Sequence, residues 1–186
     1  MTSNHLWRSQ LINNSQLWAE FNLCSIDAQL PNGMTTETKK VYPGELATTY
    51  QVLTLAHEYR NAAIHLVALG RPREPLSRAP FRLAAIHAIE LYLNAFLLQR
   101  GHPASEIRGL QHNLAERLKL AATYGLHLKV KTAQHINDLA ENREYLVTRY
   151  GPEMTNSASK LNRLTATMEE VSSKISKSMT AEVARM

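Results

Sequence analysis

The segment from Phe81 to Gln99 constrains the fold most, because it is apolar on almost every side of a predicted helix. A surface helix has one apolar stripe, whereas a helix that is apolar all round is enclosed by other elements. Its polar exceptions, His87, Glu90 and Asn94, are three and four residues apart and so form one polar stripe. We therefore expect a bundle built around this central helix.

Three further core helices are predicted over residues 48–69, 107–124 and 131–150, where apolar residues recur every three or four positions. Gly70, Gly125 and the Gly151-Pro152 pair are typical helix ends. In the first of these helices the apolar stripe consists of Val52, Leu55, Tyr59, Ala62, Leu66 and Leu69. The pattern predicts an all-α protein, an up-and-down bundle of four to five helices with an N-terminal extension and a C-terminal amphipathic helix.

The expected domain boundaries follow changes in composition. Residues 1–46 mix Asn, Ser, Thr and Gly with isolated apolar residues and are predicted to be a loosely structured N-terminal extension. Residues 47–152 are predicted to form the bundle and residues 153–186 the C-terminal amphipathic helix. In the extension, one short helix could dock on the domain or on a partner through Trp7, Leu11, Trp18 and Phe21. The C-terminal helix returns onto the bundle or pairs with a second subunit through its heptad positions Leu161, Leu164, Met168, Val171 and Ile175.

Composition narrows the class of protein. A net charge of +5 is a mild indication of an anionic partner. The single cysteine, Cys24, the missing secretory leader and the absence of an apolar run near 20 residues predict a cytoplasmic protein without a membrane segment. The eight histidines form no His-Glu-x-x-His pattern and no Cys-x-x-Cys occurs, so we predict no metal and no cofactor.

Arg143 is the leading candidate for a site, because it falls on the apolar face of the predicted 131–150 helix. A guanidinium does not lose its proton and needs a partner when buried. Glu90 is the one carboxylate on the central helix and is the expected partner, with His87 and Asn94 extending the pair into a polar network. Such a network either fixes helix register or binds a ligand.

If the site is functional, Arg143 and Arg149 would supply positive charge to a phosphate. Hydrogen bonds would come from neighbouring polar groups, giving the candidate ligand-binding set Glu90, Asn94, Asn142, Arg143, Arg149 and Tyr150. A loop before the central helix either widens this basic surface or is simply solvated, and it carries Arg71, Arg73 and Arg78, with Arg82 just inside the helix.

The string AIHAIELYLNAFLL from Ala85 to Leu98, followed by Arg100-Gly101, resembles the second helix of HEPN domains, the higher-eukaryote and prokaryote nucleotide-binding helical bundles. Segments 108–114, 121–126 and 144–152 are also similar to bacterial members, so the resemblance covers residues 47–152. It implies a helical bundle that is usually dimeric and has a polar site near the dimer cleft. Residues 108–114 contain His112, for which the resemblance implies a capping or packing role.

Family ribonucleases carry an arginine, a polar residue and then a histidine four to six residues after the arginine, on the last core helix. Here Arg143 matches the arginine, but Glu144 follows it and Arg149 stands six positions on. The resemblance therefore implies a catalytically degenerate nucleotide- or RNA-binding or interaction module, such as those of bacterial defence and toxin-antitoxin systems.

Two alternatives remain open at this point. The first is a metal-independent endoribonuclease toxin that uses Arg60 and His65 of the first helix, or His87 with Arg143. The second is a non-catalytic protein partner of a nucleotidyltransferase.

Overall fold

The structure is a computed structural model that describes the backbone of residues 41–183. The described residues form one compact unit. The expected docking helix around Trp7 and Trp18, and Cys24, lie outside the described residues.

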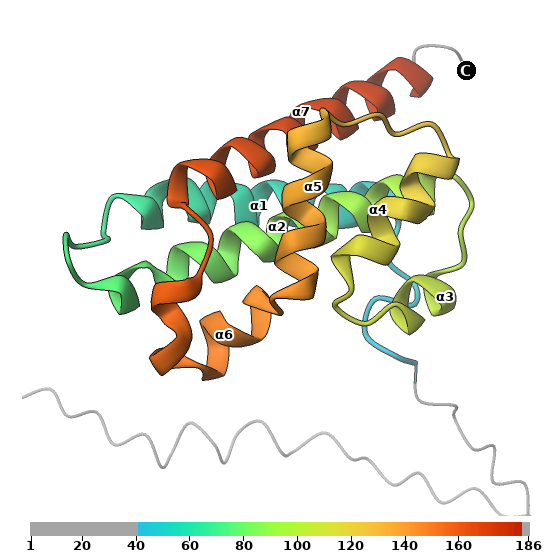
Figure 1. Ribbon diagram of the computed structural model, residues 1–186. Helices are drawn as coiled ribbons and strands as arrows, with labels where there is room; N and C mark the ends of the chain where they lie inside the picture. Colours follow the sequence, from blue (N-terminus) through green and yellow to red (C-terminus); the bar gives the residue numbers. More distant parts are fainter. Residues whose placement is uncertain (1–40, 184–186) are drawn as a thin grey trace, which may run out of the picture. The chain divides into compact units, whose positions relative to one another are not determined.

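The described residues are all-α, and no strand occurs among them, so the predicted fold class is confirmed. The seven α-helices and two 3₁₀ helices of residues 41–183 are shown in Figure 1. In chain order they are α1 (Thr49–Val67), η2 (Pro75–Arg78), α2 (Ala79–Gln99), α3 (Ala104–Gly109), α4 (Leu114–Thr123), α5 (Val130–Glu141), α6 (Glu144–Tyr150), η3 (Pro152–Ser157) and α7 (Leu161–Val183).

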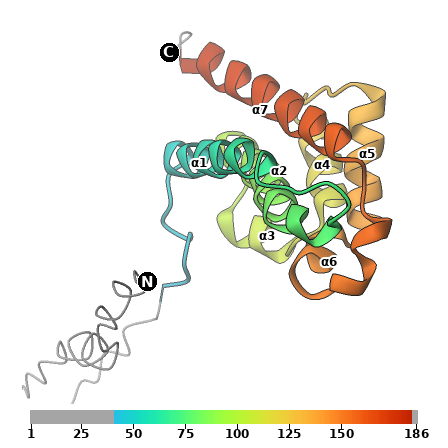
Figure 2. The same ribbon diagram turned by 90° about the vertical axis from the view of Figure 1, so that its left-hand side faces the viewer.

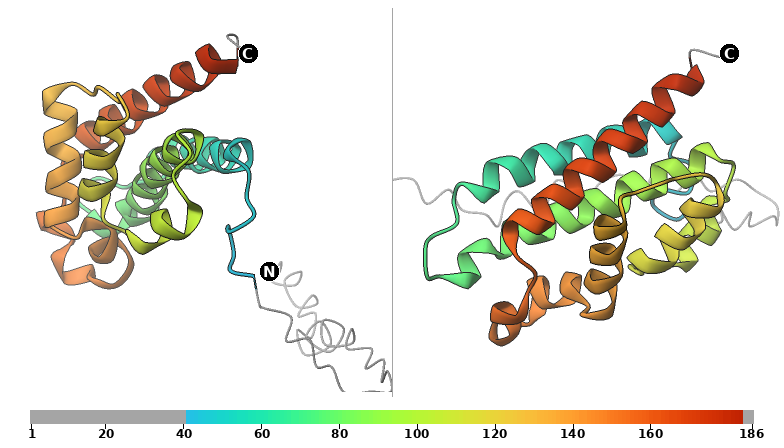
Figure 3. Two further views of the ribbon diagram at one scale, coloured as in Figure 1. Left: turned by 90° about the vertical axis from the view of Figure 1, so that its right-hand side faces the viewer. Right: turned by 45° about the horizontal axis from the view of Figure 1, so that its top comes forward.

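Helix α2 is the central helix, as its apolar surface predicts. It contacts α1, α4, α6 and α7, and its residues Ala85, Ile89 and Leu93 have no exposed surface. Figures 2 and 3 show α1 on one side of α2, the α4–α5 pair on the other, and α7 crossing above them. The segment 75–99 is long and apolar enough to span a membrane by composition alone, but 72% of its apolar window is buried inside the protein. The apolar side chains of this segment therefore form the core of the bundle.

Helix α1 begins in a capping box, in which Thr48 and Gln51 bond to each other's backbone N–H groups. It lies against α2 through two fully buried small residues, Ala56 and Ala63. The apolar stripe predicted to face the core is instead at the edge of this contact: Leu55, Tyr59, Ala62 and Leu69 are exposed, and Val52 and Leu66 are half-buried. Small side chains allow the two backbones to approach closely, and this turns the larger residues outward.

Two predicted helices are each divided by a residue in the left-handed conformation. Gln111, with φ 49°, lies between α3 and α4, where Asn113 caps α4 by accepting a hydrogen bond from the N–H of Glu116 at 3.1 Å. Arg143, with φ 47°, lies between α5 and α6. Neither break has a glycine or proline at its left-handed position, which is why the sequence pattern runs through both of them.

Helix α7 returns onto the bundle, the first of its two predicted arrangements. Leu164, Met168, Val171 and Ile175 are fully buried, and the helix contacts α2 and α5 (Figure 3). The heptad stripe is therefore used within the chain.

Candidate functional site

Glu90 is the centre of a polar cluster in the otherwise apolar α2. It is 7% exposed, and its Oε1 lies 3.2 Å from a terminal guanidinium nitrogen of Arg117. Its Oε2 lies 3.1 Å from Nδ1 of His112 and 4.0 Å from Nδ1 of His87. The predicted pairing of Glu90 with Arg143 is therefore wrong, because Arg117 of α4 takes that place.

Arg117 is buried to 2% exposure and uses its nitrogens in several directions. Nε donates to Oδ1 of Asn94 at 2.8 Å, so the polar stripe His87, Glu90 and Asn94 does lie in one network. The remaining N–H groups donate to backbone carbonyls of α3 and of the loop before α4, namely those of Ile107, Leu110, Gln111 and Asn113. Burial lowers the pKa of Arg117, and the Glu90 carboxylate opposes that shift. Arg117 thus holds the 109–113 loop against α2.

The two histidines beside Glu90 have different environments. His87 is partly buried edge-to-face against Tyr59, with ring centroids 4.4 Å apart. Burial lowers its pKa, Glu90 raises it, and the nearby charges of His112 and Arg149 lower it further. His112 is more exposed, at 45% of its side chain, and its ring is tilted 41° against Tyr145 at 4.9 Å. A proton on Nδ1 of His112, donated to Glu90, would leave Nε2 free to accept a proton.

His112 opens onto a groove of about 680 Å³ between the 109–113 loop and the junction of α5 with α6. We call it the junction groove. Gln111, Asn113 and Tyr145 also line it, together with Arg143, Asn137, Glu116 and Glu141. Gln111 and Arg143, both non-glycine residues at positive φ, therefore border the same groove. Left-handed non-glycine residues tend to gather at functional sites, because the surrounding fold must offset their strain.

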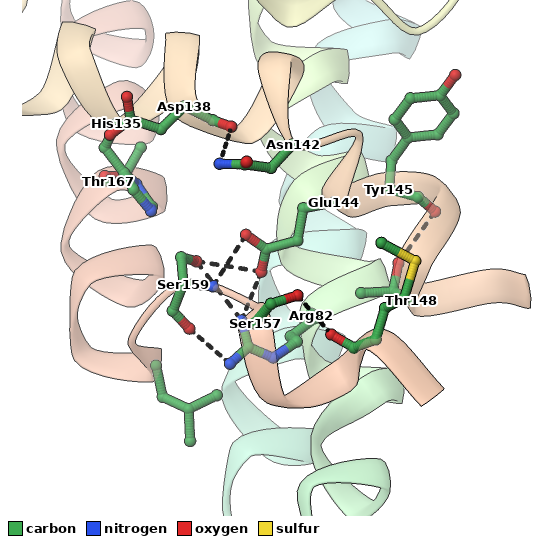
Figure 4. A network of polar contacts seen from close by, with 12 residues as sticks. Arg82, His135, Asp138, Asn142, Glu144, Tyr145, Thr148, Ser157, Ser159 and Thr167 are labelled. Atoms are coloured by element: carbon green, nitrogen blue, oxygen red, sulfur yellow. Dashed lines mark hydrogen bonds and ion pairs between the residues drawn. The ribbon is translucent and has the colours of Figure 1, made fainter. Parts of the chain in front are cut away.

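The prediction that Arg143 lies on the apolar face of one continuous 131–150 helix is wrong. It is exposed at the end of α5, and the next residue, Glu144, is buried instead. The reason is the left-handed turn, which ends one helix and restarts the next in a different rotation. Glu144 then faces α2 and meets the guanidinium of Arg82 at 2.5 Å, as Figure 4 shows. Ser159 completes this contact, because its N–H and hydroxyl donate to the Glu144 carboxylate and its carbonyl accepts from Arg82.

The other predicted ligand residues are not gathered in the junction groove. Asn142 is exposed at the C-terminal end of α5. Its side chain donates a hydrogen bond to the carbonyl of Asp138 at 2.9 Å. Arg149 and Tyr150 are exposed at the end of α6, with the guanidinium 5.7 Å from the Tyr150 ring centroid. Asn94 is occupied by Arg117. Of the predicted ligand-binding set, Arg143 alone lines the groove. Glu90 contacts the groove only indirectly, through its hydrogen bond with the lining residue His112.

The predicted basic loop is mostly structural. Arg82 is buried with Glu144, and Arg78 donates to the carbonyl of Val67 at 3.0 Å near the end of α1. Arg71 pairs with Glu74 at 2.6 Å, and Arg73 is exposed at φ 62°. These four arginines therefore do not make the continuous positive surface that their spacing indicates.

Arg60 and His65, the pair expected in a nuclease, do not form a site together. Arg60 reaches across from α1 to α7 and binds Glu169 at 2.6 Å, whereas His65 is exposed on a different side of α1. Across residues 41–183, no group of three or more His, Cys, Asp or Glu side chains is arranged to hold a metal ion.

Comparisons of the chain with protein-family models, with curated proteins and with solved structures gave no match. The interpretation of the site therefore depends on its own residues.

Proposed function

We propose that this protein is a HEPN-like nucleotide- or RNA-binding module of the cytoplasm, without catalysis of its own, and that the junction groove is its binding site. The observation that carries the proposal is the placement of Arg143. This exposed guanidinium borders a groove whose opposite wall carries His112 and Gln111. It is also the residue that the family resemblance assigns to the site.

The chemistry of the groove matches a small part of a nucleic acid. The guanidinium of Arg143 can donate two parallel hydrogen bonds to one phosphate. Aromatic surface for a base is available on Tyr145 and His112, and the amides of Gln111 and Asn113 can bond to a base edge. Glu116 and Glu141 also line the groove and would repel a run of phosphates. The groove therefore suits one nucleotide with its phosphate on Arg143.

A metal-independent endoribonuclease is the second candidate, and the contact of Glu90 with His112 is the observation that favours it. With Glu90 holding its Nδ1 proton, His112 could remove the proton of an RNA 2′-hydroxyl as that oxygen attacks the adjacent phosphate. The P–O5′ bond then breaks to leave a 2′,3′-cyclic phosphate, and the departing 5′-oxygen takes a proton from water. Arg143 would stabilise the negative charge that develops on the phosphate oxygens. The rival use of Arg60 with His65 has no such support, because Glu169 already binds Arg60.

We also propose that the protein forms a homodimer through the faces of α1 and α2. Leu55, Tyr59 and Ala62 form an exposed apolar stripe on α1, and Leu83 of α2 is 38% exposed. Tyr59 contacts His87, so this face continues toward the polar cluster around Glu90. The exposed apolar residues of α1 and α2 can be buried against the same residues of a second subunit across a two-fold axis.

The test is fluorescence-polarisation binding of labelled ATP and of a labelled 12-nucleotide single-stranded RNA to wild type and to Arg143→Asn. Asparagine tolerates the left-handed conformation but has no charge, so the backbone is preserved while the guanidinium is removed. Arg73→Asn is the matched control, because Arg73 is another exposed arginine at positive φ. We expect Arg143→Asn to lose ATP and to bind the RNA more weakly, and Arg73→Asn to keep the wild-type affinity for both. Equal binding by all three proteins would contradict the proposal.

The same RNA, checked on a denaturing gel, separates binding from cleavage. Intact RNA with the wild-type protein supports the module without catalysis. Cleavage that disappears in His112→Ala, and persists in the exposed-histidine variant His65→Ala, would instead support the nuclease.

A further inference from the structure

A second groove, of about 790 Å³, lies at the opposite end of α5, where the start of that helix meets α7. We call it the basic groove. Five basic side chains line it, Lys129, Lys131, Arg163, Lys174 and Lys177, against two acidic ones, Glu169 and Glu170. The sequence gives no indication of this cluster, because its two halves are more than 30 residues apart and meet only in the fold.

Both acidic residues of the basic groove are already matched by other groups. Glu169 forms its ion pair with Arg60 of α1. The carboxylate of Glu170 accepts hydrogen bonds from the N–H of Lys129 and the hydroxyl of Thr132, both at 2.7 Å. Burial alone would raise the pKa of Glu170, but these two bonds and the charges of Lys129 and Lys174 outweigh burial and lower it. Glu170 thus stays ionised while it caps the start of α5, so that helix end is not the anion site.

Four of the five basic residues, the lysines, are exposed, and Arg163 is half-buried. In the part of the chain that the structure describes, the five make no ion pair within 4 Å. Arg163 donates to the carbonyl of Lys131, and Lys174 donates to the carbonyl of His127, so these contacts position two of the cations without neutralising them. Arg163, Lys174 and Lys177 lie on one face of α7, and 14 residues of helix extend about 21 Å. The groove therefore carries five positive charges against two negative ones, with Glu170 between Arg163 and Lys174 on α7.

We propose that the basic groove binds the phosphodiester backbone of a single RNA strand. A cluster of four lysines and one arginine, with the exposed hydroxyl of Ser173, suits phosphate contacts that carry no base sequence. The proposal goes beyond the nucleotide in the junction groove, because it assigns a second surface at the other end of α5. A furrow of about 500 Å³ between α4 and α5 shares Ala115, Glu116 and Asn137 with the junction groove and reaches Leu128, next to the basic groove.

Salt dependence tests the proposal directly. Binding of the labelled 12-nucleotide RNA is measured from 50 mM to 500 mM NaCl for wild type and for the double variant Lys174→Gln/Lys177→Gln. Each phosphate contact of a single strand contributes about 0.7 to the slope of log K against log salt. We expect the double variant to lose about 1.4 from that slope, which corresponds to roughly 25-fold weaker binding at 0.1 M salt. Lys160→Gln, an exposed lysine outside the basic groove, is the control and should keep the wild-type slope.

The two proposals fail in different ways. Labelled ATP reports on the junction groove, so Arg143→Asn should lose ATP whereas Lys174→Gln/Lys177→Gln should retain it. An unchanged salt slope in the double variant, with its circular dichroism melt intact, would overturn the basic groove as an RNA site. So would an equal loss in Lys160→Gln, or an absence of RNA binding by the wild type at 50 mM NaCl.

Discussion

Glu144 and Arg82 form a buried ion pair, 2.5 Å long, with 4% and 8% of their side chains exposed. The pair joins the first residue of α6 to the first turn of α2. Through Ser159 it also holds the segment that leads into α7. One contact therefore sets the positions of two helices on the central one (Figure 4).

Breaking this pair should be strongly destabilising. Glu144→Ala leaves Arg82 buried without a counter-charge, and we expect the free energy of unfolding to fall by about 3–5 kcal/mol. Urea denaturation followed by circular dichroism measures the change. The double variant Arg82→Met/Glu144→Leu should recover most of the loss, because it removes both charges. Glu153→Ala, at an exposed glutamate of η3, is the control, and an equal effect in the control would remove the special role of the pair.

Stability should fall as the pH drops below about 6.5. His135 is 5% exposed, and burial lowers its pKa, as burial also does for His87. The folded state then binds fewer protons than the unfolded state, whose histidines titrate near 6.5, so stability is complete above that pH and declines below it. Urea denaturation at pH 7.5 and pH 5.5 measures the difference. His135→Gln should reduce it and His65→Gln should not, and a pH-independent wild type would disprove the expectation.

Removing Arg143 should raise stability while it removes binding. A left-handed conformation costs a non-glycine residue roughly 1–2 kcal/mol, and glycine adopts it freely at an entropic cost of about 0.5–1 kcal/mol. We therefore expect Arg143→Gly to increase the free energy of unfolding by about 0.5–1 kcal/mol, measured by urea denaturation. The same change at Arg149, within α6, should lower it by about 1 kcal/mol. A destabilised Arg143→Gly would mean that the arginine side chain holds the junction together.

The homodimer should depend on the apolar stripe of α1. Leu55 is 46% exposed, and Leu55→Glu would place a charge in the proposed interface. We expect a dimeric mass for wild type and a monomeric mass for the variant in size-exclusion chromatography with light scattering. Leu76→Glu, at a 55% exposed leucine of η2, should remain dimeric. A monomeric wild type at high protein concentration would rule the dimer out.

The fold class could be predicted from the sequence because helical periodicity is a local property. The central place of α2 followed from residues 81–99 alone. The break at Arg143 could not be foreseen, since no glycine or proline marks it and arginine seldom has positive φ. Because of that single turn, Glu144 is buried in place of Arg143. The buried ion pair therefore forms between Glu144 and Arg82, and not between Arg143 and Glu90.

The site was only partly predictable. Glu90 was expected to need a buried arginine, and the sequence did contain a signal for the right one. Arg117 shares the apolar face of α4 with Leu114, Leu118 and Ala121, and an arginine on an apolar helix face indicates a buried partner. The role of His112 carried no local signal, because it depends on how the 109–113 loop folds back toward α2.

The anchoring of the 109–113 loop by Arg117 bears on the affinity of the junction groove for a ligand. The guanidinium of Arg117 binds four backbone carbonyls, three in this loop and that of Ile107 just before it. Asn94 and Glu90 in turn hold the guanidinium in place. One wall of the junction groove is thus rigid before any ligand arrives. Preorganisation of this kind spares a ligand the conformational entropy of ordering a loop, so the proposed nucleotide would need few contacts to bind there.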